Sequence, residues 1–461
     1  MDILTFVICA FALQVVCFYV GKKSFSEQND QADYFLAGKA LKFFPLMMTC
    51  IATQVGGGLV LGATEEAYKY GWAVILYPMG ACIGLILLGL GVGRKLAELE
   101  VSTSAQIFEK IYGSKTLKKI ASSLSIITLF MILVAQFLAS SKFMASLGVD
   151  SRILFVVFWA IVITYTTLGG FKAVVSTDVV QVQFFVVAFA FCAAWIFFMG
   201  GNQNIELLVS GDTGSSFDWN LSKMFGWLLM PLFFMLIEQD MAQRCFAGES
   251  SKVVSKAFFW SGICTMLICL FPITIGILAH GMNLQFEAGR SVLMEMVSFS
   301  TNGYISAFVG CAILAATIST ADSLISAISS NLSLDFDTFM SKGNEVRNSQ
   351  IITVVISMAG IFLSFFFINV VDVLIFSYEL SVSCLFVSTL FAIFRKKGHW
   401  LPASLSIGFG ALGFACFRFM PDVVLKELIT IFISLLGFGL GELVVYSRKD
   451  IKDEAIMNLS R

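Results

Sequence analysis

Long apolar stretches dominate the chain, and polar or charged residues gather in short segments between them. A helix of about 20 mostly apolar residues is long enough to cross a lipid bilayer. We identify thirteen such stretches in the sequence, each with uncertain ends. They begin near Ile3, Leu41, Trp72, Ile120, Ile153, Val179, Met224, Val254, Asn302, Ile351, Val371, Leu401 and Leu425.

These stretches predict a bundle of α-helices. Backbone N–H and C=O groups in lipid must pair within the protein, and for runs of this length helices satisfy that requirement. We therefore predict an all-α polytopic membrane protein with a single transmembrane domain over residues 1–461. It has a leading helix at about 3–20, a core at about 41–395, trailing helices at about 400–446 and a tail at 447–461.

Composition agrees with lipid as the surrounding medium. Apolar residues make up 58% of the chain and charged residues 13%, whereas soluble domains carry about 25% charged residues. The formal net charge of −1 argues against nucleic acid as a partner. The apolar stretches contain no GxSxG or HExxH motif and no paired catalytic carboxylates, so we predict that the protein is not an enzyme.

The basic residues predict the orientation of the chain in the membrane. When the segments between helices are assigned alternately to two sides, 23 of the 30 Lys and Arg residues fall on one side and 7 on the other. Segments rich in Lys and Arg face the cytoplasm. We expect a multi-pass protein of the cell membrane, with its N-terminus outside and its C-terminus in the cytoplasm.

A glycine run interrupts the stretch that begins near Leu41. The sequence ATQVGGGLVLG places Gly56, Gly57 and Gly58 near the middle of that helix, although each glycine disfavours a helix by up to about 1 kcal/mol relative to alanine. Small residues permit close helix packing. Alternatively, the helix unwinds here and offers backbone carbonyls to an ion, as in transporters with broken helices. The run alone supports both interpretations equally.

Five acidic residues lie within predicted spans: Asp178, Glu238, Asp240, Asp322 and Glu379. A charge in the centre of a membrane costs at least about 2.5 kcal/mol, so a functional role is the default hypothesis. Asp178 and Asp240 lie near predicted cytoplasmic ends, where an interfacial position would explain them equally well. Glu238 and Asp322 lie deeper and favour function more strongly.

The helix that begins near Asn302 carries hydroxyls and a carboxylate on one face. Ser319, Asp322, Ser323 and Ser326 are spaced i, i+3, i+4 and i+7 in the sequence STADSLIS. Oxygen atoms of this kind are ligands for hard cations. The alternative is that the hydroxyls bond to carbonyls of their own helix, which explains a single hydroxyl better than a group that includes a carboxylate.

The residues now resemble the sodium:solute symporter family over nearly the whole chain. Four segments carry the resemblance: DYFLAGKALKFFPLMMTCIATQVGGG leading into EEAYKYGW, YTTLGGFKAVVSTDVVQ, EQDMAQRCFAGES and LAATISTADSLISAISSNLSLDF. The resemblance implies a LeuT-like fold with a 5+5 inverted repeat, one leading helix and two trailing helices. It also implies sodium-coupled import of a small organic solute by alternating access, with sodium as the co-transported ion.

The resemblance further implies positions for sodium. The family's common site matches the backbone carbonyls of Ala52, Val55 and Ala316 and the hydroxyls of Ser319 and Thr320.

Some relatives have a second sodium site toward the cytoplasm. It matches Asp178, Ser319, Asp322 and Ser323. Some of those relatives have serine where Asp322 stands. The additional carboxylate would either tighten cation binding or hold a proton, so the number of coupled ions stays open.

Within the family, the chain looks most similar to the choline-transporter branch, through VGGG, GATEEAY and STADS. That branch offers aromatic side chains to a quaternary ammonium at positions where this sequence has Gln54 and Glu238. An amine, a zwitterion or another small metabolite bound by hydrogen bonds is therefore expected. The candidate substrate-binding residues are Gln54, Gln136, Phe137, Phe234 and Glu238.

A non-transporting sensor that binds solute through a transporter-like membrane domain is the alternative function. The tail after Tyr446 is only about fifteen residues long and contains no output domain, so the sequence favours transport.

Overall fold

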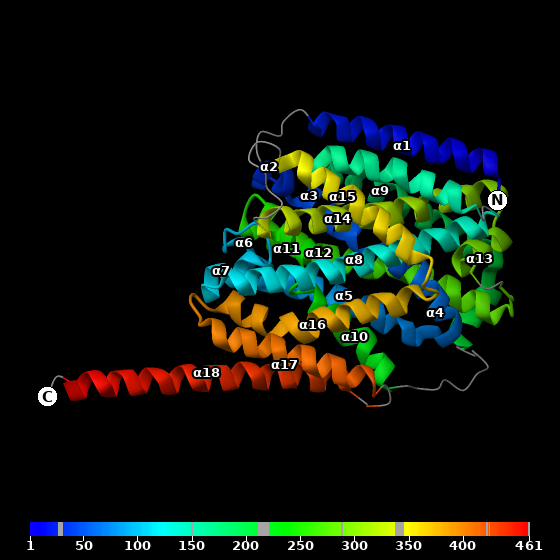
Figure 1. The fold of residues 1–461 in the computed structure, drawn as a ribbon. Coiled ribbons are helices and arrows are strands. Elements are labelled where there is room, and N and C mark those ends of the chain that lie inside the picture. The colour runs from blue at the N-terminus through cyan, green and yellow to red at the C-terminus, as the bar shows by residue number, and fades with distance from the viewer. Residues whose placement is uncertain are drawn as a thin grey trace.

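The structure is a computed structural model that describes residues 1–25, 31–148, 151–210, 221–286, 289–336, 345–420, 423 and 425–459. Helices make up nearly all of the described chain (Figure 1). The first half contains α1 (Ile3–Phe25), α2 (Gln31–Leu36), η1 (Ala37–Lys39), α3 (Phe43–Gln54), η2 (Gly58–Gly62), α4 (Ala63–Tyr70), η3 (Gly71–Ile75), α5 (Leu76–Leu87), η4 (Leu88–Val92), α6 (Gly93–Ala97), α7 (Gln106–Tyr112), α8 (Lys115–Ser146) and α9 (Arg152–Ser210). The second half contains α10 (Leu221–Met235), α11 (Gln239–Ala247), α12 (Ser251–Gly281), α13 (Val292–Ser300), α14 (Gly303–Asp335), α15 (Glu345–Ser364), α16 (Val370–Phe394), α17 (Trp400–Arg418) and α18 (Lys426–Leu459).

The described residues include ten helical segments that are long and apolar enough to cross a membrane. Three shorter apolar helices, Phe43–Gln54, Phe155–Thr164 and Gln350–Ser364, lie where further spans are expected from the sequence. The prediction of an all-α polytopic membrane protein is confirmed. The exact count of thirteen spans stays a prediction, because these three segments are shorter than a full crossing.

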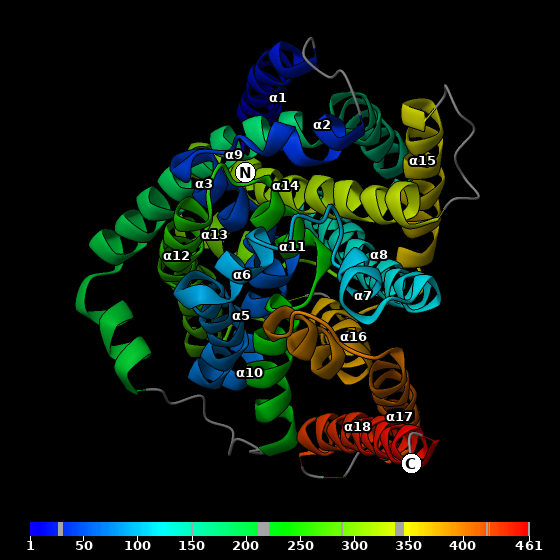
Figure 2. The ribbon, with the colours of Figure 1, turned by 90° about the vertical axis from the view of Figure 1, so that its left-hand side faces the viewer.

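Helix α14 forms the centre of the bundle, and α1 lies at its edge. In α14, 89% of the most apolar window is buried inside the protein, compared with 6% in α1. Both views place α17 and α18 at the edge opposite α1 (Figures 1 and 2). We call the end of the bundle that holds the start of α1 the Met1 end, on the right in Figure 1, and the other end the Phe25 end.

The predicted spans that begin near Ile153 and Val179 both lie within α9. Gly170 divides them, with φ 61° and ψ −175°. Glycine adopts a positive φ without the steric penalty of a side chain, so the chain reverses direction here and returns along the bundle.

Two helices that cross the bundle are broken in the middle. Helix α3 ends at Gln54, Val55 has non-helical angles (φ −81°, ψ 69°), and the chain resumes as the π-helical segment η2, followed by α4. Of the two interpretations of the glycine run, a helix break is therefore present in the structure, at Val55 directly before the first glycine. The second break, between Met235 of α10 and Gln239 of α11, is not foreseen in the sequence.

The ends of the two broken helices are joined at the Phe25 end. Leu41, just before α3, donates its backbone N–H to Ala247 at the end of α11, over 3.1 Å. Its carbonyl accepts from Glu249, over 3.0 Å. This bridge aligns the two helices so that their breaks face the same central region.

Side-chain caps begin several of the long helices. Ser114, Ser250, Asn302 and Asn369 each accept a hydrogen bond from a backbone N–H in the first turn of α8, α12, α14 and α16. Such caps satisfy one of the N–H groups that have no partner within the helix. These polar residues therefore set where the apolar stretches begin as helices.

Candidate functional site

The predicted common sodium site lies where the break after α3 meets α14. The hydroxyl of Ser319 lies 3.1 Å from the Ala52 carbonyl oxygen and 2.9 Å from that of Ala316. The Thr320 hydroxyl lies 3.0 Å from the Ala52 carbonyl and 3.3 Å from that of Ala316. Four of the five predicted ligand groups are thus brought together. The fifth residue, Val55, directly follows the last residue of α3 and is buried.

Glycine is required beside this site. A Cβ on Gly56 would collide with the hydroxyl of Thr320 and lie 2.8 Å from Oε1 of Gln136. The next residue, Gly57, donates its backbone N–H to the same Gln136 oxygen over 2.7 Å. The glycine run therefore provides the helix break and also permits close packing, so both interpretations of the run hold.

The four predicted residues of the second sodium site make different contacts. Ser319 belongs to the group around Ala52, and Asp322 accepts a hydrogen bond from Thr166 of α9 over 2.5 Å. Asp178 accepts one from Thr49 of α3 over 2.5 Å, and Ser323 one from Thr53 over 3.0 Å. All four lie at the contact between α14, α9 and α3, and each is at most 1% exposed.

A buried arginine joins part of this region. Arg244 of α11 is 0% exposed and donates to Ser323 over 2.7 Å and to Thr49 over 3.0 Å. The same nitrogen lies 3.8 Å from Oδ2 of Asp178. A buried charge needs a partner and hydrogen bonds to offset its desolvation. This guanidinium therefore supplies positive charge directly beside two of the predicted second-site residues.

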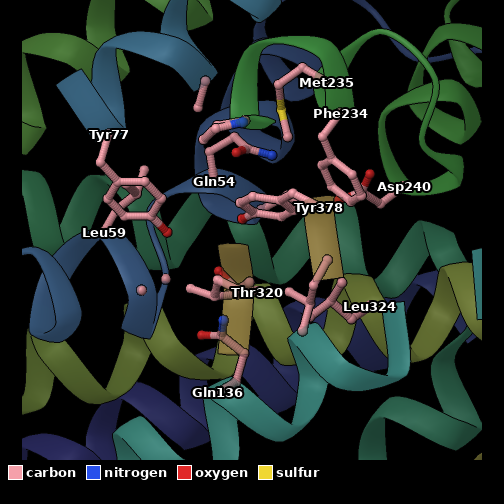
Figure 3. A pocket seen from close by; sticks show the side chains of 17 residues that line it. Gln54, Leu59, Tyr77, Gln136, Phe234, Met235, Asp240, Thr320, Leu324 and Tyr378 are labelled. Atoms are coloured by element: carbon pink, nitrogen blue, oxygen red, sulfur yellow. The ribbon is translucent and has the colours of Figure 1, made fainter. Parts of the chain in front are cut away.

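A small central cavity lies between the two helix breaks and α8, α14 and α16. Its volume is about 30 Å³, which is room for about two water molecules. Figure 3 shows Tyr378 beside Phe234, whose ring centroids are 4.4 Å apart. The lining residues are Thr53, Gln54, Gly56, Gly58, Leu59, Tyr77, Ala81, Ile132, Gln136, Pro231, Phe234, Met235, Asp240, Thr320, Leu324, Leu374 and Tyr378.

Three of the five predicted substrate-binding residues line this cavity: Gln54, Gln136 and Phe234. Phe137, the fourth, packs edge-on against Trp159, with ring centroids 4.6 Å apart, and is not among the lining residues.

Glu238 also lies outside the cavity lining. It caps α11 and accepts hydrogen bonds from Ser125 of α8 (2.6 Å) and Ser381 of α16 (3.0 Å). The acidic residue that lines the cavity is Asp240, two positions further along the chain.

Polar contacts join the helices at both ends of the bundle. At the Met1 end, Glu66 of α4 meets Lys223 of α10 at 3.1 Å and Asn369, the residue before α16, at 3.2 Å. At the Phe25 end, Gln239 of α11 bonds to the backbone N–H of Ser104 over 2.6 Å and to Ser330 of α14 over 3.0 Å. Contacts between helices therefore lie on both sides of the central cavity along the bundle.

Asp240, Arg244 and Tyr378 are the site residues that sequence reasoning missed. A continuous helix over this span predicts that Asp240 lies near one end, where an interfacial position explains it equally well. The break before α11 places it beside the cavity instead. Arg244 lies within the segment EQDMAQRCFAGES, four residues after Asp240 and six after Glu238, and a basic residue in an otherwise apolar span is the signal for a buried carboxylate partner.

Comparisons with known proteins agree with this geometry. The profile of the sodium:solute symporter family matches residues 34–399. The sodium/pantothenate symporter of Haemophilus influenzae is 26% identical over 278 residues, which cover 57% of this chain and 55% of that protein. High-affinity choline transporter 1 of Drosophila melanogaster is 22% identical over 387 residues, covering 78% and 61%. The chain thus spans little more than half the length of these relatives.

A solved structure shares the fold. The structure of a Na⁺-coupled sialic acid symporter in a substrate-bound outward-open state aligns with a TM-score of 0.80 and 16% identity, covering 95% of this chain and 97% of that one. The predicted LeuT-like architecture is confirmed by likenesses of this kind. With the profile match over most of its length, the chain belongs to the sodium:solute symporter family.

Proposed function

We propose that this protein is a sodium-coupled secondary symporter that imports a small amine or zwitterion across the cell membrane by alternating access. The observation that carries the proposal is the convergence of the Ser319 and Thr320 hydroxyls on the Ala52 carbonyl, at the break after α3. Family membership supports the same conclusion. No feature of the described residues favours the alternative of a non-transporting sensor over transport.

The common sodium position uses neutral oxygen ligands. Ala52, Val55 and Ala316 provide carbonyls, and Ser319 and Thr320 provide hydroxyls. In the described conformation, the hydroxyls donate to two of these carbonyls at 2.9 to 3.3 Å. A sodium ion between them would turn all these oxygens toward itself and replace its hydration shell with them.

A second cation is proposed near Asp178, Ser319, Asp322 and Ser323. Asp178 and Asp322 are each at most 1% exposed, and Arg244 lies 3.8 Å from Asp178. Buried carboxylates near one position repel each other when both are ionised, so a second cation bound beside them would lower that repulsion.

The proposed solute position is the central cavity. Asp240 supplies a carboxylate for an ammonium group, and the rings of Phe234 and Tyr378 form an aromatic wall beside it. Gln54 and Gln136 supply amides for further hydrogen bonds. The two relatives described above are named for chemically different solutes, pantothenate and choline, so the solute class proposed here rests on these side chains.

The proposed orientation places the Met1 end outside the cell and the Phe25 end in the cytoplasm. It rests on the 23 of 30 basic residues that the predicted topology assigns to the Phe25 side. In this arrangement, residues 1–461 form one transmembrane domain, the core at about 41–395 carries the sites, and the tail at 447–461 is cytoplasmic.

Uptake into proteoliposomes tests the function. Choline, pantothenate and a panel of amines and amino acids are supplied with an inward sodium gradient, an equal potassium gradient or no gradient. We expect at least one amine or zwitterion to accumulate only with the sodium gradient. Sodium-dependent binding without accumulation of any solute would instead identify a sensor.

The same vesicles measure the number of coupled ions, and we expect two sodium ions per solute. Each sodium gains about 2.3 kcal/mol per 100 mV, and a tenfold gradient adds about 1.4 kcal/mol. One sodium then sustains roughly 500-fold accumulation of a neutral solute, and two sustain on the order of 10⁵-fold. Reversal potentials at varied sodium and pH give the ratio. A ratio of one, unchanged in Asp178→Asn and Asp322→Asn, would leave this pair with a structural role.

Asp240 and Glu238 offer a matched comparison of two buried acids. We expect Asp240→Asn to weaken apparent solute affinity by about tenfold or more, which corresponds to about 1.4 kcal/mol, because the residue lines the cavity. Glu238→Gln removes a carboxylate that bonds to Ser125 and Ser381 instead. It should lower thermal stability more than solute affinity. The assignment is refuted if Glu238→Gln alone changes solute affinity.

A further inference from the structure

A second and much larger cavity lies at the Met1 end, between α10, α16 and α18. Its volume is about 880 Å³, enough for a solute of moderate size. It shares no lining residue with the central cavity. Its aromatic wall includes Trp227, Phe366 and Phe376, and a smaller cavity of about 50 Å³ continues from the same charged residues between α16, α17 and α18.

Charged residues concentrate in the wall that the two cavities share. Glu379 of α16, Arg418 of α17, and Lys426 and Glu427 of α18 line both of them. Lys426 and Glu379 form an ion pair at 3.6 Å. Glu379 and Glu238 are the two acidic residues noted in the apolar spans that neither the sodium positions nor the central cavity uses.

Glu427 is buried without a full set of partners. It is 5% exposed, and its Oε2 atom has no hydrogen-bond partner among the described residues. Its Oε1 atom lies 3.3 Å from where a Cβ on Gly226 of α10 would stand, so the carboxylate reaches from α18 to α10. A buried polar atom without a hydrogen-bond partner destabilises the folded protein. A hydrogen-bond donor on a molecule bound in the cavity would satisfy the Oε2 atom of Glu427.

Arg418 provides the opposite charge in the same wall. Its guanidinium stacks on the ring of Phe376, 4.9 Å from the ring centroid, and the side chain lines both cavities. Guanidinium groups bind carboxylates through two parallel hydrogen bonds. The wall therefore contains a guanidinium and also a carboxylate with one oxygen that lacks a hydrogen-bond donor. It is complementary to a molecule that carries both an ammonium and a carboxylate.

We propose that this cavity is a second solute-binding site, separate from the central one, that takes a zwitterion of the amino-acid type. The ammonium of the solute donates to Glu427, its carboxylate meets Arg418, and its side chain packs on the aromatic wall. The proposal requires only binding and does not depend on the transport function.

The position of the site links it to the closure at the Met1 end. Lys223 and Asn369 line the same cavity and also hold Glu66 of α4, at 3.1 and 3.2 Å. A solute bound here lies beside the contacts that join α4, α10 and α16. Its binding is coupled to these contacts to the extent that its affinity differs between their formed and broken states.

The test compares L-leucine with its two singly charged parts, 3-methylbutylamine and 4-methylpentanoate. Binding to the full chain in nanodiscs is measured by equilibrium dialysis in sodium-free potassium buffer, with the Asp240→Asn background to remove the central carboxylate. We expect L-leucine to bind at least about tenfold more tightly than either part, equivalent to about 1.4 kcal/mol. Equal affinities of the three, or no leucine binding up to about 10 mM, which corresponds to about −2.7 kcal/mol, would overturn the proposal.

Variants assign the two charges. Glu427→Gln should weaken leucine binding by about tenfold and leave 4-methylpentanoate unchanged, whereas Arg418→Gln should weaken 4-methylpentanoate and leave 3-methylbutylamine unchanged. Glu295→Gln, a surface acid paired with Arg290 at 3.3 Å, is the matched control and should have no effect. Should Glu427→Gln not fold, Gly226→Ala, which crowds the same carboxylate, replaces it. Unchanged leucine binding in a folded variant of either kind refutes the site.

Discussion

Replacing both Ser319 and Thr320 with alanine is expected to raise the sodium concentration for half-maximal uptake by about tenfold or more, equivalent to about 1.4 kcal/mol. The two hydroxyls lie 3.1 and 3.0 Å from the Ala52 carbonyl, where α14 meets the last turn of α3 just before its break. Without them, three carbonyls remain to replace the hydration shell of sodium. The remaining coordination is too incomplete to offset ion dehydration.

The measurement is sodium-dependent uptake in proteoliposomes, with protein folding checked by size-exclusion chromatography. Thr317→Val is a matched control, because Thr317 lies on the same helix and its hydroxyl bonds to the Ile313 carbonyl of that helix over 2.9 Å. The control should keep the wild-type sodium dependence. If the double variant folds and also keeps it, sodium binds elsewhere.

Replacing Arg244 with leucine is expected to lower the free energy of unfolding by about 3 to 5 kcal/mol, the cost of leaving a buried partner charge uncompensated. Arg244 is 0% exposed, and it contacts Ser323 of α14, Thr49 of α3 and the backbone carbonyl of Asp240. Its charge lies 3.8 Å from Asp178. The substitution therefore removes one partner of a buried ion pair together with the hydrogen bonds that join α11 to α3 and α14.

A second substitution separates charge from packing. Adding Asp178→Asn to Arg244→Leu removes the carboxylate that lost its partner, so the double variant should be more stable than Arg244→Leu alone. Denaturation in detergent micelles, followed by circular dichroism, measures both. Arg94→Leu is the control, since its ion pair with Glu98 is more than half exposed and such pairs contribute about 0 to 1 kcal/mol. No recovery in the double variant would mean that packing, rather than charge, makes Arg244 necessary.

The sequence indicated the membrane class, the helical architecture and one of the two helix breaks. These properties depend on local composition: an apolar stretch of sufficient length becomes a helix in lipid, and three adjacent glycines weaken a helix wherever it packs. The resemblance also placed the common sodium ligands on two segments, and in the structure Ser319 and Thr320 lie against Ala52.

The solute-facing residues were harder to predict. Gln54, Gln136 and Phe234 line the central cavity, whereas Phe137 and Glu238 do not. Position along a continuous helix suggested that Glu238 was deep and Asp240 shallow. The break before α11 changes the direction of the side chains that follow it, so Asp240 reaches the cavity and Glu238 becomes a cap. No local run of glycines signals this break, which makes it hard to locate from the sequence.

The sequence by itself determined that the chain crosses a membrane as helices, because length and apolar composition suffice for that; the cation position at α14 and the break after α3 stays a prediction. Only the tertiary structure decided which charges meet. Arg244 and Asp178 are 66 positions apart in the sequence (244 − 178), and Glu427 reaches Gly226 from a helix near the other end of the chain. Burial makes such long-range contacts strong, because a charge removed from water must find its partner inside the protein, and sequence spacing does not reveal that partner.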